Sequence, residues 1–129
     1  MAPISVTLAP RDPPAAIVAL VGEHDAYSAD RLDSELAVLL EERRCVVVDL
    51  RDTEFIDSAT LGALLAAQRE AERSNLGFAV VLPSRNYTQV SRLLELTGLA
   101  SSFAIYDTLD QALSAARRGD NGGTVRSAA

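Results

Sequence analysis

Ser58 is the residue best placed to do chemistry, because it follows Asp57 where an apolar segment gives way to a helix-like segment. The first turn of a helix leaves backbone N–H groups without intrahelical partners, so a hydroxyl there is exposed and surrounded by hydrogen-bond donors. Such a serine could cap the helix, act as a nucleophile or accept a phosphoryl group. The three roles require different neighbouring residues.

A nucleophilic serine needs a general base, and His24 is the only histidine in the chain. A Ser58–His24–Asp25 triad can be written on paper. Adjacent residues of a strand point to opposite faces, however, and no glycine-flanked nucleophile turn surrounds the serine. The sequence therefore favours an ordinary loop or interface role for His24. We expect no catalytic residue, although a small hydrolase that uses Ser58 stays open as a third hypothesis.

Carboxylates gather just before the serine, at Asp49, Asp52, Glu54 and Asp57. They could suggest a metal site or a receiver-type phosphoaspartate pocket, but such a pocket uses a lysine and this chain has none. Zinc-ligand spacing and a glycine-rich phosphate loop are also absent, and the lone Cys45 is predicted to be a small buried hydrophobe. We expect no metal and no cofactor, and we interpret Asp52 and Glu54 as solvated loop charges.

Composition narrows the class of partner. The 129 residues are 48% hydrophobic and 5% aromatic, which predicts one domain with an aliphatic core. The net charge of −6 argues against direct nucleic-acid binding, which needs a basic face, and favours a protein partner with a basic surface. No apolar run approaches the roughly 20 residues of a membrane span, and the N-terminus lacks a signal-peptide pattern. We expect a soluble cytoplasmic protein without a membrane partner; the sequence leaves its oligomeric state open.

The hydrophobic pattern predicts two strands followed by alternating helices and strands. This order is typical of an α/β fold with a central mixed, mostly parallel β-sheet of about five strands and about four α-helices. Ser28 and Asp107 are the expected N-caps of the first and last helices, and Gly98 is the expected stop of the third. We expect one domain over 1–118 and a disordered tail over 119–129. The predicted strands cover 4–9, 15–21, 45–50, 78–82 and 102–106, and the helices begin near Ser28, Ser58, Tyr87 and Asp107.

Four segments carry a family resemblance. In chain order they are Gly22-Glu23-His24-Asp25, the strand 46–50, Phe55-Ile56-Asp57-Ser58 with Leu61-Gly62, and Leu94-Glu95-Leu96-Thr97-Gly98-Leu99. On these residues, and over roughly Ile4 to Leu113, the chain resembles the anti-sigma factor antagonists, the small bacterial STAS domains of partner-switching pathways. The resemblance implies a STAS-like single domain and a non-enzymatic regulator of transcription.

The resemblance also implies roles for individual residues. Ser58 matches the phosphorylation site, and Asp25 and Asp57 match acidic residues linked to partner binding and phosphotransfer. Glu23, Ser58 and Thr60 complete the expected partner-binding set. Asp25 is expected to lie close to Ser58 if the second predicted strand ends beside the third.

In this family, the unphosphorylated antagonist binds an anti-sigma factor that is also a serine kinase, and so frees the sigma factor. Phosphorylation breaks the complex, and a PP2C-type phosphatase restores it. The alternative is a STAS-type scaffold that binds a protein or a ligand without being phosphorylated.

Three positions depart from the family pattern. His24 replaces an aliphatic residue, Ala59 stands where a second Ser or Thr is common, and Thr60 stands where Gly is common. We expect the β-branched Thr60 to crowd the start of the helix.

Overall fold

A five-stranded sheet forms the centre of the molecule. The computed structural model describes residues 3–9 and 11–122. Strand β1 pairs antiparallel with β2, and the remaining neighbours pair parallel, which confirms the predicted mixed, mostly parallel sheet. The spatial order is β1 (Ile4–Ala9), β2 (Ala15–Leu20), β4 (Cys45–Asp49), β6 (Phe78–Val81) and β7 (Ala104–Tyr106).

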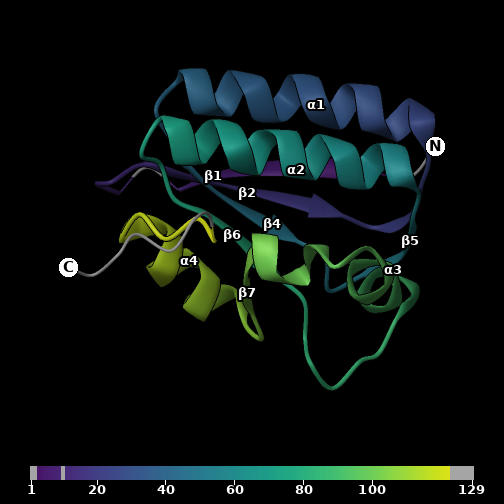
Figure 1. The fold of residues 1–129 in the computed structure, drawn as a ribbon. Helices are drawn as coiled ribbons and strands as arrows, with labels where there is room; N and C mark the ends of the chain where they lie inside the picture. Colours follow the sequence, from purple (N-terminus) through teal and green to yellow (C-terminus); the bar gives the residue numbers. More distant parts are fainter. Residues whose placement is uncertain (1–2, 10, 123–129) are drawn as a thin grey trace.

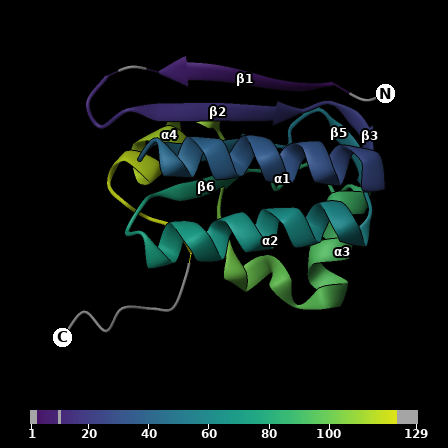
Figure 2. The same cartoon turned by 90° about the horizontal axis from the view of Figure 1, so that it is seen from above.

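Helices cover both faces of this sheet. Figures 1 and 2 show α1 and α2 side by side over one face, while α4 lies against the other. Helix α3 contacts the short strand that precedes α2 and continues into a 3₁₀ turn, η1. The bounds are α1 (Ala26–Glu41), α2 (Ser58–Arg73), α3 (Gln89–Thr97), η1 (Leu99–Ser102) and α4 (Leu109–Arg117). Among the described residues, no helix is both long enough and apolar enough to cross a membrane.

Strand β4 explains why two cores form. Its residues alternate between the faces, so Val46 and Val48 join the core beneath α1 and α2, while Cys45 and Val47 join the core beneath α4. All five residues of β4 are buried, as expected of a central parallel strand. Cys45 is thus the buried hydrophobe that the sequence predicted, and burial raises the pKa of its thiol.

A second, two-stranded sheet was not predicted from the sequence. It pairs β3 (Gly22–His24) with β5 (Thr53–Ile56) in parallel. Each of these strands has only three or four residues, too few for a clear alternation of apolar and polar positions, so the sequence pattern does not distinguish them from loops.

The predicted helix caps are correct at Gly98 and wrong at two other positions. Gly98 ends α3 with a positive φ of 71°, as glycine allows. Ser28 lies buried inside α1, whose N-cap is Asp25. Thr108 caps α4, whereas the Asp107 carboxylate accepts a hydrogen bond from the Ser84 N–H at 2.7 Å. Ser, Thr and Asp are all good N-cap residues. Which of them caps a helix depends on the position at which the preceding strand ends.

The structure differs from the expected disorder at the start of the tail. Residues 119–122 belong to the folded domain, because the Phe78 N–H donates to the Asp120 carbonyl oxygen at 2.9 Å and Asn121 is buried. This hydrogen bond joins the end of the domain to the start of β6, a long-range contact that composition cannot reveal. The rest of the predicted tail, 123–129, lies outside the described residues.

Helix α4 approaches the sheet closely at Gly77. A Cβ atom built there would lie 1.8 Å from the Ala116 carbonyl oxygen, so we expect Gly77→Ala to lower the free energy of unfolding by ~1–3 kcal/mol or more. The control is Gly62→Ala in α2, where an added Cβ meets no atom within 4 Å. This substitution should raise the free energy of unfolding by ~0.5–1 kcal/mol, because alanine favours a helix more than glycine does. Urea denaturation measures both. An unchanged midpoint for Gly77→Ala would contradict the packing described.

Candidate functional site

The pairing of β3 with β5 brings together the two segments that carry the predicted site. Glu23 lies beside Phe55 and His24 beside Ile56. The Asp57 N–H donates to the His24 carbonyl oxygen at 3.1 Å. Since the strands are parallel, the residues that follow them emerge at the same edge.

Two helices begin at this edge, each capped by an aspartate. Asp25 caps α1 and accepts a hydrogen bond from the Tyr27 N–H at 3.1 Å. Asp57 caps α2 and accepts from the Thr60 N–H at 2.8 Å. Because the two helices lie side by side with their N-termini at the same edge (Figures 1 and 2), the positive ends of both helix dipoles face the same region.

Thr60 links the two helix starts. Its side chain is fully buried, and its hydroxyl oxygen lies 2.9 Å from Asp57 Oδ1, 3.3 Å from the Asp25 carbonyl oxygen and 3.4 Å from that of His24. The single hydroxyl proton can be donated to one of these acceptors at a time, and all three lie on the two segments that precede α1 and α2. The expected crowding does not occur, because the β-branched side chain fills a buried polar position between β3 and α2.

Ser58 is the first residue of α2, and its side chain is exposed. Its hydroxyl has no hydrogen-bond partner in the part of the chain that the structure describes, since Asp57 provides the cap. Asp57 directly precedes the serine and is half-buried, and the exposed Asp25 caps the neighbouring helix at the same edge. Of the three roles open to the serine, the capping role belongs to its neighbour.

His24 is a buried residue, and the expectation of a loop or interface role is wrong. The ring is fully buried, and Nε2 donates to the Val21 carbonyl oxygen at 3.0 Å. Nδ1 is then unprotonated, and it has no hydrogen-bond partner among the described residues. Burial lowers the pKa of the ring despite the nearby Asp25 carboxylate. A ring enclosed in this way supports a packing role rather than that of a base at the surface.

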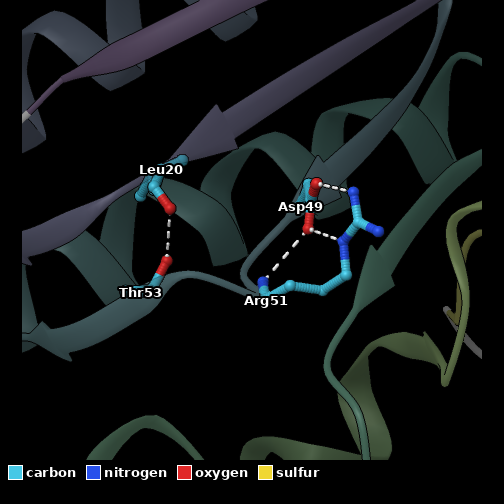
Figure 3. A network of polar contacts seen from close by, with 4 residues as sticks. All are labelled: Leu20, Asp49, Arg51 and Thr53. Carbon is cyan, nitrogen blue, oxygen red and sulfur yellow. Dashed lines mark hydrogen bonds and ion pairs between the residues drawn. The ribbon is translucent and has the colours of Figure 1, made fainter.

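The turn between β4 and β5 is held by polar contacts that the sequence analysis did not predict (Figure 3). The buried Asp49 carboxylate accepts from the Arg51 N–H at 3.0 Å and, bidentately, from its guanidinium at 2.9 and 2.7 Å. The Thr53 hydroxyl donates to the Leu20 carbonyl oxygen at 2.7 Å. The Asp49–Arg51 bonds hold the turn after β4, and the Thr53–Leu20 bond fastens the start of β5 to the end of β2.

The carboxylates that could have suggested a metal site do not converge. Asp49 is engaged by Arg51, while Asp52 and Glu54 are exposed as predicted, although Glu54 lies in β5 and not in a loop. Within 3–9 and 11–122, no group of three or more His, Cys, Asp or Glu side chains could hold a metal ion. A groove of about 730 Å³ lies between α4 and the ends of β6 and β7, but none of the predicted site residues lines it.

Gln89 is a further residue that the sequence analysis missed. It is the first residue of α3, and its side-chain amide makes two hydrogen bonds with the backbone of Ile56, two residues before the serine. Only the spatial neighbourhood of α3 and β5 reveals this contact, so no sequence signal could have found it.

Burial of His24 predicts a pH dependence of stability. Because its pKa is lowered in the folded state, the unfolded chain binds more protons than the folded protein below pH ~6.5. The free energy of unfolding should therefore fall as the pH drops from ~6.5 towards the folded-state pKa.

In His24→Gln, the part of this pH dependence that comes from the histidine should disappear, while the part that comes from carboxylates at lower pH remains. Urea denaturation between pH 7.5 and 5 measures both proteins. Equal slopes for the two proteins below pH 6.5 would contradict the assignment.

Comparisons with known proteins match the resemblance. A model of the STAS domain family matches residues 7–112. The anti-sigma-F factor antagonist RsfB of Mycobacterium tuberculosis is 31% identical over 120 residues, which cover 92% of this chain and 95% of the relative. The anti-sigma F factor antagonist of Paenibacillus polymyxa is 32% identical over 101 residues, covering 75% and 82%.

A solved structure shows the same fold. The crystal structure of an anti-sigma factor antagonist from Mycobacterium paratuberculosis superimposes with a TM-score of 0.71 at 30% identity, covering 89% of this chain and 95% of that one. The fold, the sequence relatives and the family match agree, and the chain belongs to the STAS domain family.

Proposed function

We propose that this protein is an anti-sigma factor antagonist switched by phosphorylation of Ser58. The unphosphorylated form binds an anti-sigma factor that is also a serine kinase in the cytoplasm, and thereby regulates sigma-factor-dependent transcription. Phosphorylation releases it, and a PP2C-type phosphatase restores binding. The protein itself is not an enzyme. The observation that carries the proposal is the exposed Ser58 hydroxyl, which has no hydrogen-bond partner in the described chain and is rigidly presented beside Asp57.

The isolated domain can tolerate a phosphate at Ser58. Because the cap of α2 is Asp57, modification of the serine removes no capping hydrogen bond. The N-terminal dipole of a helix favours a negative charge by ~0.3–1 kcal/mol, and two helices begin at this edge. The fold need not change when the phosphate is added.

The cost of the phosphate appears when a partner covers the site. Phosphorylation adds a charge of about −1.5 to −2 next to Asp57, at the edge where Glu23 and Asp25 also lie. Two unit charges about 4 Å apart repel by ~1 kcal/mol in water but by ~4 kcal/mol at an effective dielectric constant near 20. Exclusion of water by a partner thus raises the repulsion by ~3 kcal/mol, which corresponds to an affinity loss of more than 100-fold.

The roles of the predicted partner-binding residues divide by exposure. Glu23, Asp25 and Ser58 offer side chains that a partner can touch, and Asp57 is partly accessible. Thr60 is buried and would act through the positions of Asp25 and Asp57. The runner-up function, a STAS-type scaffold that is not phosphorylated, predicts a different result in the first experiment below.

Phosphorylation should occur at Ser58 alone. The purified anti-sigma factor kinase encoded in the same genome, with ATP and Mg²⁺, should add one phosphate to the wild-type protein and none to Ser58→Ala. Ser84→Ala, at another exposed serine, is the matched control and should be phosphorylated like the wild type. Intact-mass spectrometry counts the phosphates. Phosphate at another residue, or no phosphate on the wild type, would favour the unphosphorylated scaffold.

A negative charge at position 58 should weaken partner binding. We expect Ser58→Asp to lower the affinity for the same anti-sigma factor by at least 10-fold, while Ser58→Ala preserves it. Ser84→Asp adds the same charge elsewhere and should bind like the wild type. Isothermal titration calorimetry at two salt concentrations measures the affinities. Equal affinity for Ser58→Asp and Ser58→Ala would rule out the charge mechanism.

A further inference from the structure

We propose that Gln89 is a positioning residue that couples helix α3 to the phosphoacceptor serine by holding the backbone of Ile56. The inference rests on the proposed role of Ser58 as phosphoacceptor. It assigns a function to a residue outside the predicted site and on a different element.

The side-chain amide of Gln89 makes the two backbone hydrogen bonds to Ile56 that a neighbouring strand would make. The Ile56 N–H donates to Gln89 Oε1 at 2.9 Å, and Gln89 Nε2 donates to the Ile56 carbonyl oxygen at 2.9 Å. Both polar groups of one backbone residue are thus satisfied by one side chain. A primary amide is suited to this because it offers an acceptor and a donor on the same planar group.

The other side of the same segment is held by β3. Successive residues of a strand direct their backbone groups to opposite edges, so Ile56 faces Gln89 while the Asp57 N–H faces His24. The two residues before Ser58 are therefore fixed from opposite directions. The Ile56 side chain adds a third anchor, because it is fully buried in the core.

Gln89 itself is fixed to α3. It follows Thr88, the N-cap, whose hydroxyl oxygen accepts from the Ser91 N–H while the Thr88 N–H donates to the Ser91 hydroxyl oxygen. Val90 and Leu94 bury the inner face of the helix in the core. A displacement of α3 therefore moves the amide of Gln89, and with it the backbone two residues before Ser58.

Two substitutions separate positioning from general stability. Gln89→Met keeps the length of the side chain and removes both hydrogen bonds. Gln89→Glu has, when ionised, no donor for the Ile56 carbonyl oxygen; when protonated, its carboxyl group again offers one acceptor and one donor. Gln111→Met, at an exposed position of α4, is the matched control.

Amide hydrogen exchange, followed by NMR, tests the coupling without any partner. We expect the Ile56 and Asp57 amides to exchange at least 10-fold faster in Gln89→Met than in the wild type, and no change there in Gln111→Met. In Gln89→Glu, protection relative to the wild type at the same pH should recover as the pH is lowered from 7 to 4.5. Unchanged exchange in Gln89→Met, or no recovery in Gln89→Glu, would overturn the coupling.

Kinetics with the anti-sigma factor kinase test the positioning role. If Gln89 orients Ser58, Gln89→Met should lower kcat for phosphorylation by at least 5-fold with KM changed less than 2-fold, because the docking surface is unaltered. Faster exchange with unchanged kcat would make Gln89 structural only and overturn this role. If the kinase does not modify wild-type Ser58, the proposed function fails and the positioning role fails with it. The exchange result still decides the coupling of Gln89 to Ile56.

Discussion

The parallel pairing of β3 with β5 is the constraint on which the site depends. It joins the segment before α1 to the segment before α2, so that two helices begin at one edge. The strands are too short to be stable alone, and β5 is held at both ends: Thr53 is bonded to Leu20 at its start, and Gln89 binds Ile56 at its end, where the Ile56 side chain is also buried in the core. Side-chain hydrogen bonds to backbone thus do here what additional strands do in the main sheet.

The interior of the site is polar, and nearly every buried polar group is satisfied. The Thr60 hydroxyl lies among acceptors from β3 and from the capping residues of α1 and α2, and the Asp49 carboxylate is hydrogen-bonded to Arg51. Among the described residues, His24 Nδ1 is the exception, a buried atom without a hydrogen-bond partner. Leaving such an atom unpaired costs ~1–3 kcal/mol, so packing around the ring must compensate for it.

The sequence predicted features that depend on local pattern, and it missed those that depend on contacts between distant segments. The valine run of β4, the start of α2 at Ser58 and the glycine at the end of α3 follow from local chemistry. The pairing of β3 with β5 and the hydrogen bonds of Gln89 join residues more than 30 positions apart. The same reason explains why the crowding expected at Thr60 does not occur. The sequence shows a β-branched residue at a helix start, but only the fold shows the hydrogen-bond acceptors that surround its hydroxyl.

The separation of the capping aspartate from the adjacent serine has an evolutionary consequence. Asp57 caps the start of α2, and the exposed Ser58 side chain contributes no hydrogen bond within the described domain. Folding therefore places little selection on which small residue occupies position 58. Under the proposed function, a lineage can gain or lose covalent control at this position by one substitution while keeping the same scaffold. A regulator switched in the proposed way can thus give rise to permanent binders in a single genetic step.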